Sequence, residues 1–194
     1  MVIAVYRILV PVLLTAATAT SAATTLETAF RSLTPGTLGT PVETRTLDFP
    51  THHPQGMTAA GDCLYLSSVE VIDRATEQGT GHLFEMDRQG SLLRSITLGE
   101  GPLYHPGGID FDGTNIWVPV AAYRSNSAAI VYTVDPETME SKEVFRFNDH
   151  LGAVSHFPKQ RLLIGVNWGS RCFYRWKTKR QGDEWIVRNP DHPD

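Results

Sequence analysis

Short runs of hydrophobic and polar residues follow one another along most of the chain, separated by turns rich in glycine, proline, asparagine and aspartate. Residues 81–87 read Gly-His-Leu-Phe-Glu-Met-Asp, and a turn at 88–91 leads into another such run at 92–98. This arrangement is typical of β-strands joined by turns. After residue 23 no segment keeps the 3.6-residue apolar period of a helix for three turns, and only 26–33 is expected to form a short helix. The pattern therefore predicts an all-β protein.

A sequence repeat runs through this predicted β region. The motif His53-Pro-Gln-Gly-Met recurs 52 residues later as His105-Pro-Gly-Gly-Ile, and more faintly 45 residues after that as His150-Leu-Gly-Ala-Val. The first two copies stay in register beyond the motif, because four further pairs match: Gly61 with Gly113, Leu64 with Ile116, Tyr65 with Trp117, and Leu66 with Val118. Repeats of about 40 to 50 residues are typical of β-propeller blades.

Each repeat contains four strand-like segments, which predicts four-stranded blades at 53–104, 105–149 and 150–191 and the start of a fourth at His192. Blades bury their faces on their neighbours, so a propeller must close into a ring. Six or seven blades would need roughly 270 to 320 residues. We therefore interpret 51–194 as a partial propeller, a fragment of a six- or seven-bladed ring. Copies of such a chain could also self-associate through an exposed blade face.

The residues before the first repeat divide into two segments with different expected roles. Residues 1–23 contain one positive charge at Arg7, an apolar run at 8–14 and small residues that fit cleavage sites, which together predict a signal peptide. The apolar run is shorter than the roughly 20 residues of a membrane span. We therefore expect a secreted protein, extracellular or periplasmic, without a membrane span. In the N-terminal segment 24–50, the alternating run 42–49 is expected to supply a ring-closing strand.

Composition and charge limit the classes of partner that the protein is expected to bind. The chain has 194 residues, of which 41% are hydrophobic and 20% charged, as in an ordinary folded protein. Its net charge of -4 offers no basic patch, so no nucleic acid partner is expected. Cys63 and Cys172 lie in predicted strands of different blades, where we expect unpaired buried thiols, although export would also permit a disulfide.

One segment carries a family resemblance. Residues 106–118 read Pro-Gly-Gly-Ile-Asp-Phe-Asp-Gly-Thr-Asn-Ile-Trp-Val. This resembles the blade pattern of NHL-repeat and gluconolactonase-type (senescence-marker-like) propellers, in which a Gly-Ile/Val strand, an Asp-Gly turn and an aromatic-Val strand recur. Residues 50–194 as a whole also look like an exported β-propeller-like family without an assigned function. The resemblance implies the fold. It does not imply an activity, because propellers host unrelated functions.

The repeated histidines are the sharpest candidates for chemistry. His53, His105 and His150 each enter the innermost strand of a blade, at the mouth of the central channel, so their side chains could converge. Three neutral imidazoles could bind a divalent metal such as zinc and leave a position open for water. One imidazole could instead act as a general base. The structural alternative, which we favour, is that a His-Pro pair serves as a turn copied into each blade.

Polar residues of loops on the same face complete the candidate site. Glu70, Arg124 and Asn167, together with Asp73, are best placed to contact a ligand, although solvated charge is the commoner role of such residues. The sequence has no G-x-S-x-G, P-loop, H-E-x-x-H or C-x-x-C motif. We expect a propeller that binds a small molecule or a protein at the channel mouth. The alternative is a metal-dependent hydrolase or lyase of the lactonase type.

Overall fold

The computed structural model describes residues 26–36 and 44–191. The short helix α1 (Leu26–Arg31), close to the expected 26–33, belongs to the unit of residues 1–43, and the strands belong to the unit of residues 44–194. The predicted signal peptide, the first two residues of the expected strand 42–49, and His192 lie outside the described residues. Residues 44–49 themselves form no strand. Within the described ranges no helix is both long and apolar enough to cross a membrane.

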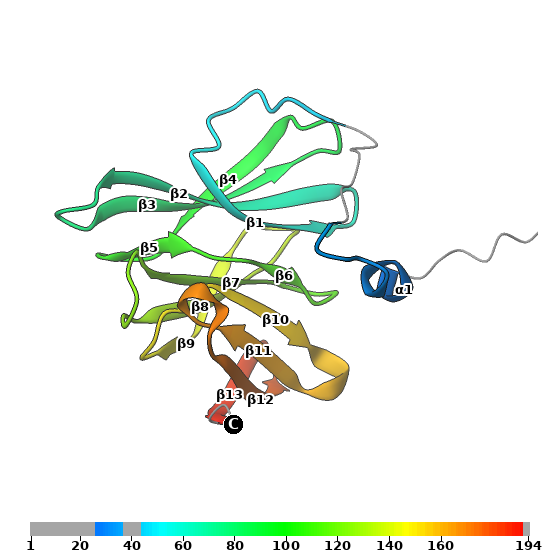
Figure 1. The fold of residues 1–194 in the computed structure, drawn as a ribbon, viewed down its shortest axis with the longest axis vertical. Helices are drawn as coiled ribbons and strands as arrows, with labels where there is room; N and C mark the ends of the chain where they lie inside the picture. Colours follow the sequence, from blue (N-terminus) through cyan, green and yellow to red (C-terminus); the bar gives the residue numbers. More distant parts are fainter. Residues whose placement is uncertain (1–25, 37–43, 192–194) are drawn as a thin grey trace, which may run out of the picture. The chain divides into compact units, whose positions relative to one another are not determined.

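The second unit consists of three successive antiparallel sheets (Figure 1). Sheet 1 contains β1 (His53–Ala60), β2 (Cys63–Asp73), β3 (Gln78–Met86) and β4 (Leu92–Leu98). Sheet 2 contains β5 (Leu103–Pro106), β6 (Asp110–Phe111), β7 (Ile116–Ala122), β8 (Ala129–Val134) and β9 (Ser141–Phe147). Sheet 3 contains β10 (Ala153–Phe157), β11 (Leu162–Val166), β12 (Phe173–Gln181) and β13 (Glu184–Asp191), with 3-10 turns at Pro158–Gln160 and Trp168–Ser170.

The predicted all-β class and the four segments per repeat are confirmed. Hydrogen-bonded neighbours follow chain order, as β1-β2-β3-β4 in sheet 1 and β10-β11-β12-β13 in sheet 3. Sheet 2 differs in that its first position is divided between β5 and β6, which both pair with β7. The Pro106-Gly107-Gly108 sequence separates these two strands, because proline cannot donate a backbone hydrogen bond and glycine weakens strand pairing.

Sheet 2 lies between two hydrophobic layers because successive residues of β7 face opposite sides. All seven residues of β7 are buried. Ile116, Val118 and Val120 pack with Tyr65, Leu83 and Leu98 of sheet 1. Trp117 and Ala121 pack on the other side with Leu151, Leu163 and Trp176 of the sheet 3 segment. Each fully buried large side chain contributes about 1.5–3 kcal/mol to folding, so β7 stabilises both layers.

The first strands of the three sheets meet backbone to backbone. The Gly108 N–H donates to the Gly152 carbonyl (2.8 Å), and the Val154 N–H donates to the Gly108 carbonyl (3.2 Å). The Ser67 hydroxyl lies within hydrogen-bonding distance of two carbonyls, those of Gly107 (2.7 Å) and Gly56 (3.2 Å). The hydrogen bonds of Gly108 thus join sheet 2 to sheet 3, and the bond from Ser67 to Gly107 joins sheet 1 to sheet 2.

This approach leaves no room for side chains at two positions of the repeated motif. A Cβ atom on Gly107 would lie 2.3 Å from the Gly152 carbonyl oxygen, and one on Gly56 would lie 2.7 Å from the Cα of Gly108. Gly152 is different, because the nearest heavy atom to its Cβ position is at 3.5 Å. The glycines that follow the repeated histidines therefore allow adjacent sheets to touch.

A buried polar network joins sheets 2 and 3. Asp112, in the β6–β7 turn, accepts hydrogen bonds from His156 Nδ1 (2.7 Å) and Trp117 Nε1 (2.7 Å). The Thr178 hydroxyl lies 3.0 Å from His156 Nε2. Asp112 and His156 side chains are 1% and 0% exposed. Although the order Asp-His-Thr resembles a proton relay, no solvent or substrate could reach it, and its role is to hold the two sheets together.

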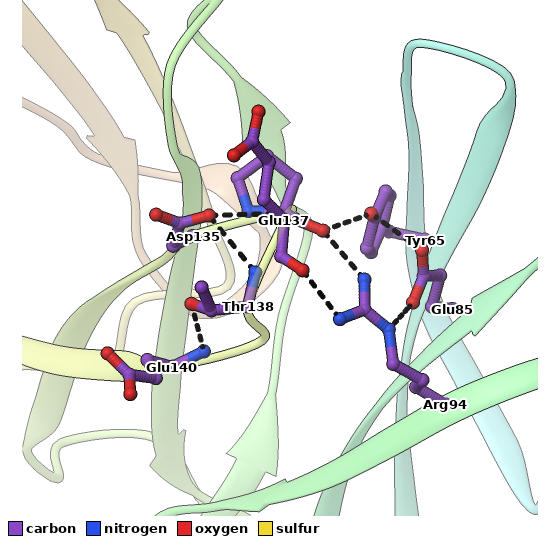
Figure 2. Close-up of polar contacts among 8 residues, drawn as sticks. Tyr65, Glu85, Arg94, Asp135, Glu137, Thr138 and Glu140 are labelled. Atoms are coloured by element: carbon purple, nitrogen blue, oxygen red, sulfur yellow. Dashed lines mark hydrogen bonds and ion pairs between the residues drawn. The ribbon is translucent and has the colours of Figure 1, made fainter.

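A second network joins sheet 1 to the β8–β9 turn of sheet 2. Figure 2 shows the Arg94 guanidinium between Glu85 of β3 and this turn, where it donates to the carbonyls of Glu137 (2.7 Å) and Pro136 (2.8 Å). The Tyr65 hydroxyl lies 3.0 Å from the Pro136 carbonyl and 3.1 Å from Glu85. Burial and the neighbouring Glu85 raise the pKa of Tyr65 to about 12, so its hydroxyl remains a donor.

We predict that Gly107→Ala destabilises the chain by about 1–3 kcal/mol, because the added methyl group must displace a backbone carbonyl rather than a flexible side chain. Gly152→Ala is the matched control, since its methyl group meets only ordinary contacts and should change stability by less than about 1 kcal/mol. Urea unfolding followed by tryptophan fluorescence measures both variants. Equal stabilities of the two variants would contradict the close approach of the strands.

We also predict that Asp112→Asn makes the stability of the fold less dependent on pH between about pH 4 and pH 2. Burial acts to raise the pKa of Asp112, but hydrogen bonds from His156, Asn115 and Trp117 outweigh it and lower the pKa to about 2. A depressed pKa stabilises the folded state above about pH 4, and this contribution disappears as the pH falls from about 4 to 2. At pH 7 the variant should be about 1–3 kcal/mol less stable.

Unfolding curves of wild type and Asp112→Asn at several values between pH 2 and pH 7 measure this effect. The difference in stability between the two proteins should shrink as the pH falls below 4. The exposed Asp62→Asn variant is the control and should follow the wild type throughout. A difference that stays constant down to pH 2 would show that the Asp112 carboxylate does not stabilise the fold in this way.

Candidate functional site

The three repeated histidines line one pocket of about 380 Å³, which we call the histidine pocket. Its wall comes from the start of β1, from β5, from the segments after β7 and before β10, and from the 3-10 turn that follows β11. The lining residues are His53, Gln55, His105, Gly107, Tyr123, His150, Gly152, Ala153, Val166, Asn167, Trp168, Gly169 and Ser170. The glycine contacts described above bring the strand entries together and so position this wall.

His105 is the most constrained of the three. Its ring stacks on that of Tyr123, with centroids 4.5 Å apart and an interplanar angle of 9°, and the residue is only 7% exposed. Its Nε2 atom is buried and has no hydrogen-bond partner among the residues that the structure describes. Burial, followed by the proximity of His150 and His53, lowers the pKa of His105 to about 4. At neutral pH this side chain is therefore an uncharged imidazole.

His150 is held by the backbone and by an aromatic neighbour. Its Nδ1 atom lies 3.0 Å from the Ala122 carbonyl oxygen, to which it donates, so its Nε2 atom is left as an acceptor. The Trp168 ring packs edge-on against it with centroids 4.8 Å apart. Burial lowers the pKa of His150 as well. His53 differs from the other two because it is exposed, and its Nδ1 atom contacts the side-chain amide of Gln55.

The pocket is polar without being charged. No Asp, Glu, Lys or Arg is among its lining residues, and the two buried imidazoles are neutral at pH 7. Tyr123 and Trp168 supply aromatic surface, and their rings lie 6.0 Å apart. Arg74 sits over the Tyr123 ring at 4.7 Å and donates to its hydroxyl (3.0 Å), which holds the ring in place.

The other predicted site residues lie in different surroundings. Asn167 lines the histidine pocket, but its side-chain oxygen accepts hydrogen bonds from the backbone N–H groups of Arg171 and Cys172 and so closes the local turn. Arg124 pairs with Glu77 (2.8 Å) and lines a separate pocket. Glu70 lies beside His52 and His82 rather than in the histidine pocket. The ligand-binding roles of these residues remain predictions.

Two pocket residues were not among the site candidates of the sequence analysis. The structure places Tyr123 and Trp168 on the pocket wall. Each follows a strand and begins a loop, Tyr123 after β7 and Trp168 after β11. An aromatic residue at the same place in two repeats was the signal that could have identified them.

The structure brings together possible metal ligands other than the three repeated histidines. Within the described ranges, His52, Glu70 and His82 form a group whose ligand atoms all lie within 4.8 Å of one another. His53, His105 and His150 form no such group. A metal at these three histidines therefore remains a prediction, and it would require their side chains to move closer together. Cys63 and Cys172 are unpaired but only partly buried, whereas the sequence predicted unpaired buried thiols.

A larger pocket of about 560 Å³ lies among the turns at the other ends of these strands. It is lined by Gly61, Gly113 and Pro136, among others, and by the Tyr65 and Glu85 side chains. These two polar side chains already bond to each other and to Pro136 or Arg94. Their groups stabilise contacts between sheets, and the histidine pocket is the stronger candidate because it contains a polar atom without a partner.

Comparisons with known proteins identify a family but no activity. No curated protein was found to match the sequence. Among the solved structures that match is a protein described as a 6-phosphogluconolactonase from Bacteroides uniformis ATCC 8492, with 16% sequence identity and a TM-score of 0.47. The match covers 72% of this chain, which spans only 42% of that protein's length. A family model matches residues 12–191, and the chain therefore belongs to the family of unknown function DUF6454.

Proposed function

We propose that the three sheets are consecutive blades of an exported β-propeller, and that the histidine pocket binds a small, uncharged, hydroxylated ring molecule. Three features support the propeller architecture: the repeat of 45 to 52 residues, the four consecutive antiparallel strand positions in each sheet, and the contact between first strands. In a propeller the first strands surround the central channel. The histidine pocket then lies where three blades meet at the channel mouth.

The observation that carries the binding proposal is the buried, unpartnered Nε2 atom of His105. Buried polar atoms without partners are rare, because each costs about 1–3 kcal/mol relative to a bonded one. A hydroxyl or carbonyl group of a ligand would supply the missing partner. His150 Nε2 offers an acceptor on the same wall, so a ligand with two polar groups could bond to both imidazoles.

The chemistry of the wall selects the ligand class. No Asp, Glu, Lys or Arg side chain lines the pocket, and the Arg74 charge lies against the Tyr123 ring, where it is bonded to the Tyr123 hydroxyl. Tyr123 and Trp168 offer flat apolar faces on which the C–H groups of a ring can pack. The volume of about 380 Å³ lies within the range of about 300–1,000 Å³ that small-molecule sites occupy. A sugar or sugar-derived lactone combines a ring with several hydroxyl groups and fits these conditions.

The lactonase-type alternative uses the same pocket with a metal bound to His53, His105 and His150. The geometry favours binding over this reaction, since these three histidines do not form a close ligand group. A divalent metal would polarise a lactone carbonyl or activate a water molecule. Hydrolysis of a lactone by the metal-loaded chain is therefore the result that would favour the alternative.

We predict that the chain binds D-glucose or glucono-1,5-lactone and that it binds gluconate, the open-chain anion, at least tenfold more weakly. Isothermal titration calorimetry at pH 7.5 measures the three affinities. Trp168→Ala should weaken binding of the ring probes at least tenfold, because it removes the aromatic wall and the support of His150. Phe173→Ala is the matched control, since this exposed aromatic residue lies outside the pocket and its loss should leave the affinity unchanged.

His105→Phe provides a second variant, which keeps the stacked ring and removes Nε2. It should bind the ring probes at least tenfold more weakly while keeping or increasing the stability of the fold, because the unpartnered nitrogen is gone. Failure of both ring probes to bind, or wild-type affinity in the Trp168→Ala and His105→Phe variants, would refute the proposal.

A further inference from the structure

A second group of histidines lies on the face of sheet 1 that is turned away from sheet 2. Tyr65 and Leu83 point toward sheet 2, whereas their alternate neighbours Leu66 and Phe84 form a separate cluster on the opposite face. Glu70 and His82 have the same parity as Leu66 and Phe84, so they also lie on this opposite face. His82 pairs with Ser68 across the two strands, and Glu70 is the next residue of that face along β2.

His52 is brought onto this face by the segment that precedes β1. The Ser68 hydroxyl donates a hydrogen bond to the Thr51 carbonyl, which attaches the segment to β2. His52 itself adopts a left-handed backbone conformation, with φ of 51°. Its ring then stacks on that of His82, with centroids 4.9 Å apart and an interplanar angle of 9°. Two imidazoles from distant parts of the backbone are thus held in parallel beside one carboxylate.

The distances in this group fit a bridging ion better than hydrogen bonds. His52 Nδ1 lies 3.9 Å from Glu70 Oε1, and His82 Nε2 lies 3.6 Å from Glu70 Oε2. Hydrogen bonds between such groups span about 2.7–3.2 Å. By contrast, two metal–ligand bonds of about 2.1 Å at the tetrahedral angle hold their donor atoms about 3.4 Å apart. Small side-chain movements would bring all three groups onto one ion.

The His82 nitrogen that faces Glu70 also lacks a partner. His82 Nε2 is buried and makes no hydrogen bond to any residue in the described part of the chain. A histidine ring nitrogen that is buried beside a carboxylate and unpartnered is available as a ligand for a metal ion.

We propose that His52, Glu70 and His82 form a binding site for a divalent transition-metal ion of the zinc class. Two nitrogens and one carboxylate suit zinc and similar ions, whereas calcium and magnesium prefer oxygen ligands alone. Three protein ligands leave a fourth tetrahedral position for water or another donor. The ion would fasten the segment before β1 to both β2 and β3.

This site is separate from the histidine pocket. None of its three residues lines that pocket, although His52 and His53 are adjacent in the sequence. The proposal stands on its own geometry and does not depend on the ligand of the pocket. The sequence prediction identified Glu70 as a ligand-binding candidate, but it assigned the metal to His53, His105 and His150.

The test is titration of the full chain, without an affinity tag, with zinc chloride in a calorimeter at pH 7.5. We expect one ion to bind per chain, and Glu70→Gln and His82→Gln to lower the affinity at least tenfold each. His53→Gln is the matched control, because it changes the neighbouring exposed histidine and should leave zinc affinity unchanged. Glu70 is partly exposed, so Glu70→Gln should fold normally.

Two further measurements do not depend on calorimetry. Zinc should raise the thermal unfolding temperature of the wild type and His53→Gln, but not that of Glu70→Gln, because the ion fastens the segment only in the folded state. Cobalt(II), bound in place of zinc, should show the intense visible absorption of a tetrahedral site, and this signal should be lost in Glu70→Gln. Absence of stoichiometric zinc binding, or its loss in His53→Gln but not in Glu70→Gln, would overturn the proposal.

Discussion

The arrangement of the sheets depends on the close contact between the first strands of neighbouring sheets. At Gly56 and Gly107 these strands approach until backbone meets backbone, and no side chain larger than hydrogen fits between them. Hydrogen bonds from Gly108 to Gly152 and from Val154 to Gly108 then connect sheet 2 with sheet 3. Hydrophobic layers pack on both faces of β7. The contact also brings together the strand entries that carry the three pocket histidines.

The buried polar networks contribute specificity to the same contacts. Apolar layers between two sheets tolerate small shifts, since hydrophobic attraction has little directional preference. Polar contacts do not tolerate such shifts. Asp112 is bonded to His156, and Arg94 is bonded to the β8–β9 turn, so each group has a partner in a neighbouring sheet. Displacing either pair of sheets would leave buried charge unpaired, which costs several kcal/mol. The networks therefore fix how the sheets are aligned.

The sequence predicted the strands well because strand and turn signals are local. Alternation at 81–87 and the Asp-Gly turn at 112–113 each report their structure within a few residues, and β3 and β7 lie where these signals expect them. The repeat also brought attention to the histidines at 53, 105 and 150, which do share a pocket. The repeat could not reveal how far apart their ring nitrogens lie. That spacing depends on the tilt of adjacent sheets, and residue order does not encode tilt directly.

Other parts of the candidate sites could not be predicted from local patterns. His52 joins Glu70 and His82 only because a left-handed residue and the Ser68–Thr51 hydrogen bond turn the chain onto the outer face of sheet 1. Tyr123 was not a site candidate, since an aromatic residue at the end of a strand usually belongs to the packing between sheets. Its place in the pocket results from stacking on His105, which lies 18 positions earlier in the sequence.

The glycine contacts also divide the pocket into parts that can evolve at different rates. His105 precedes Gly108 by three residues, and His53 precedes Gly56 by the same interval, so both histidines are tied to backbone positions that cannot accept a side chain. Tyr123 and Trp168 begin loops, where substitutions leave these contacts intact. Relatives could therefore exchange the aromatic wall, and with it the preferred ligand, without rebuilding the scaffold. Diversity within the family should concentrate in the loops after the second strand position of each sheet.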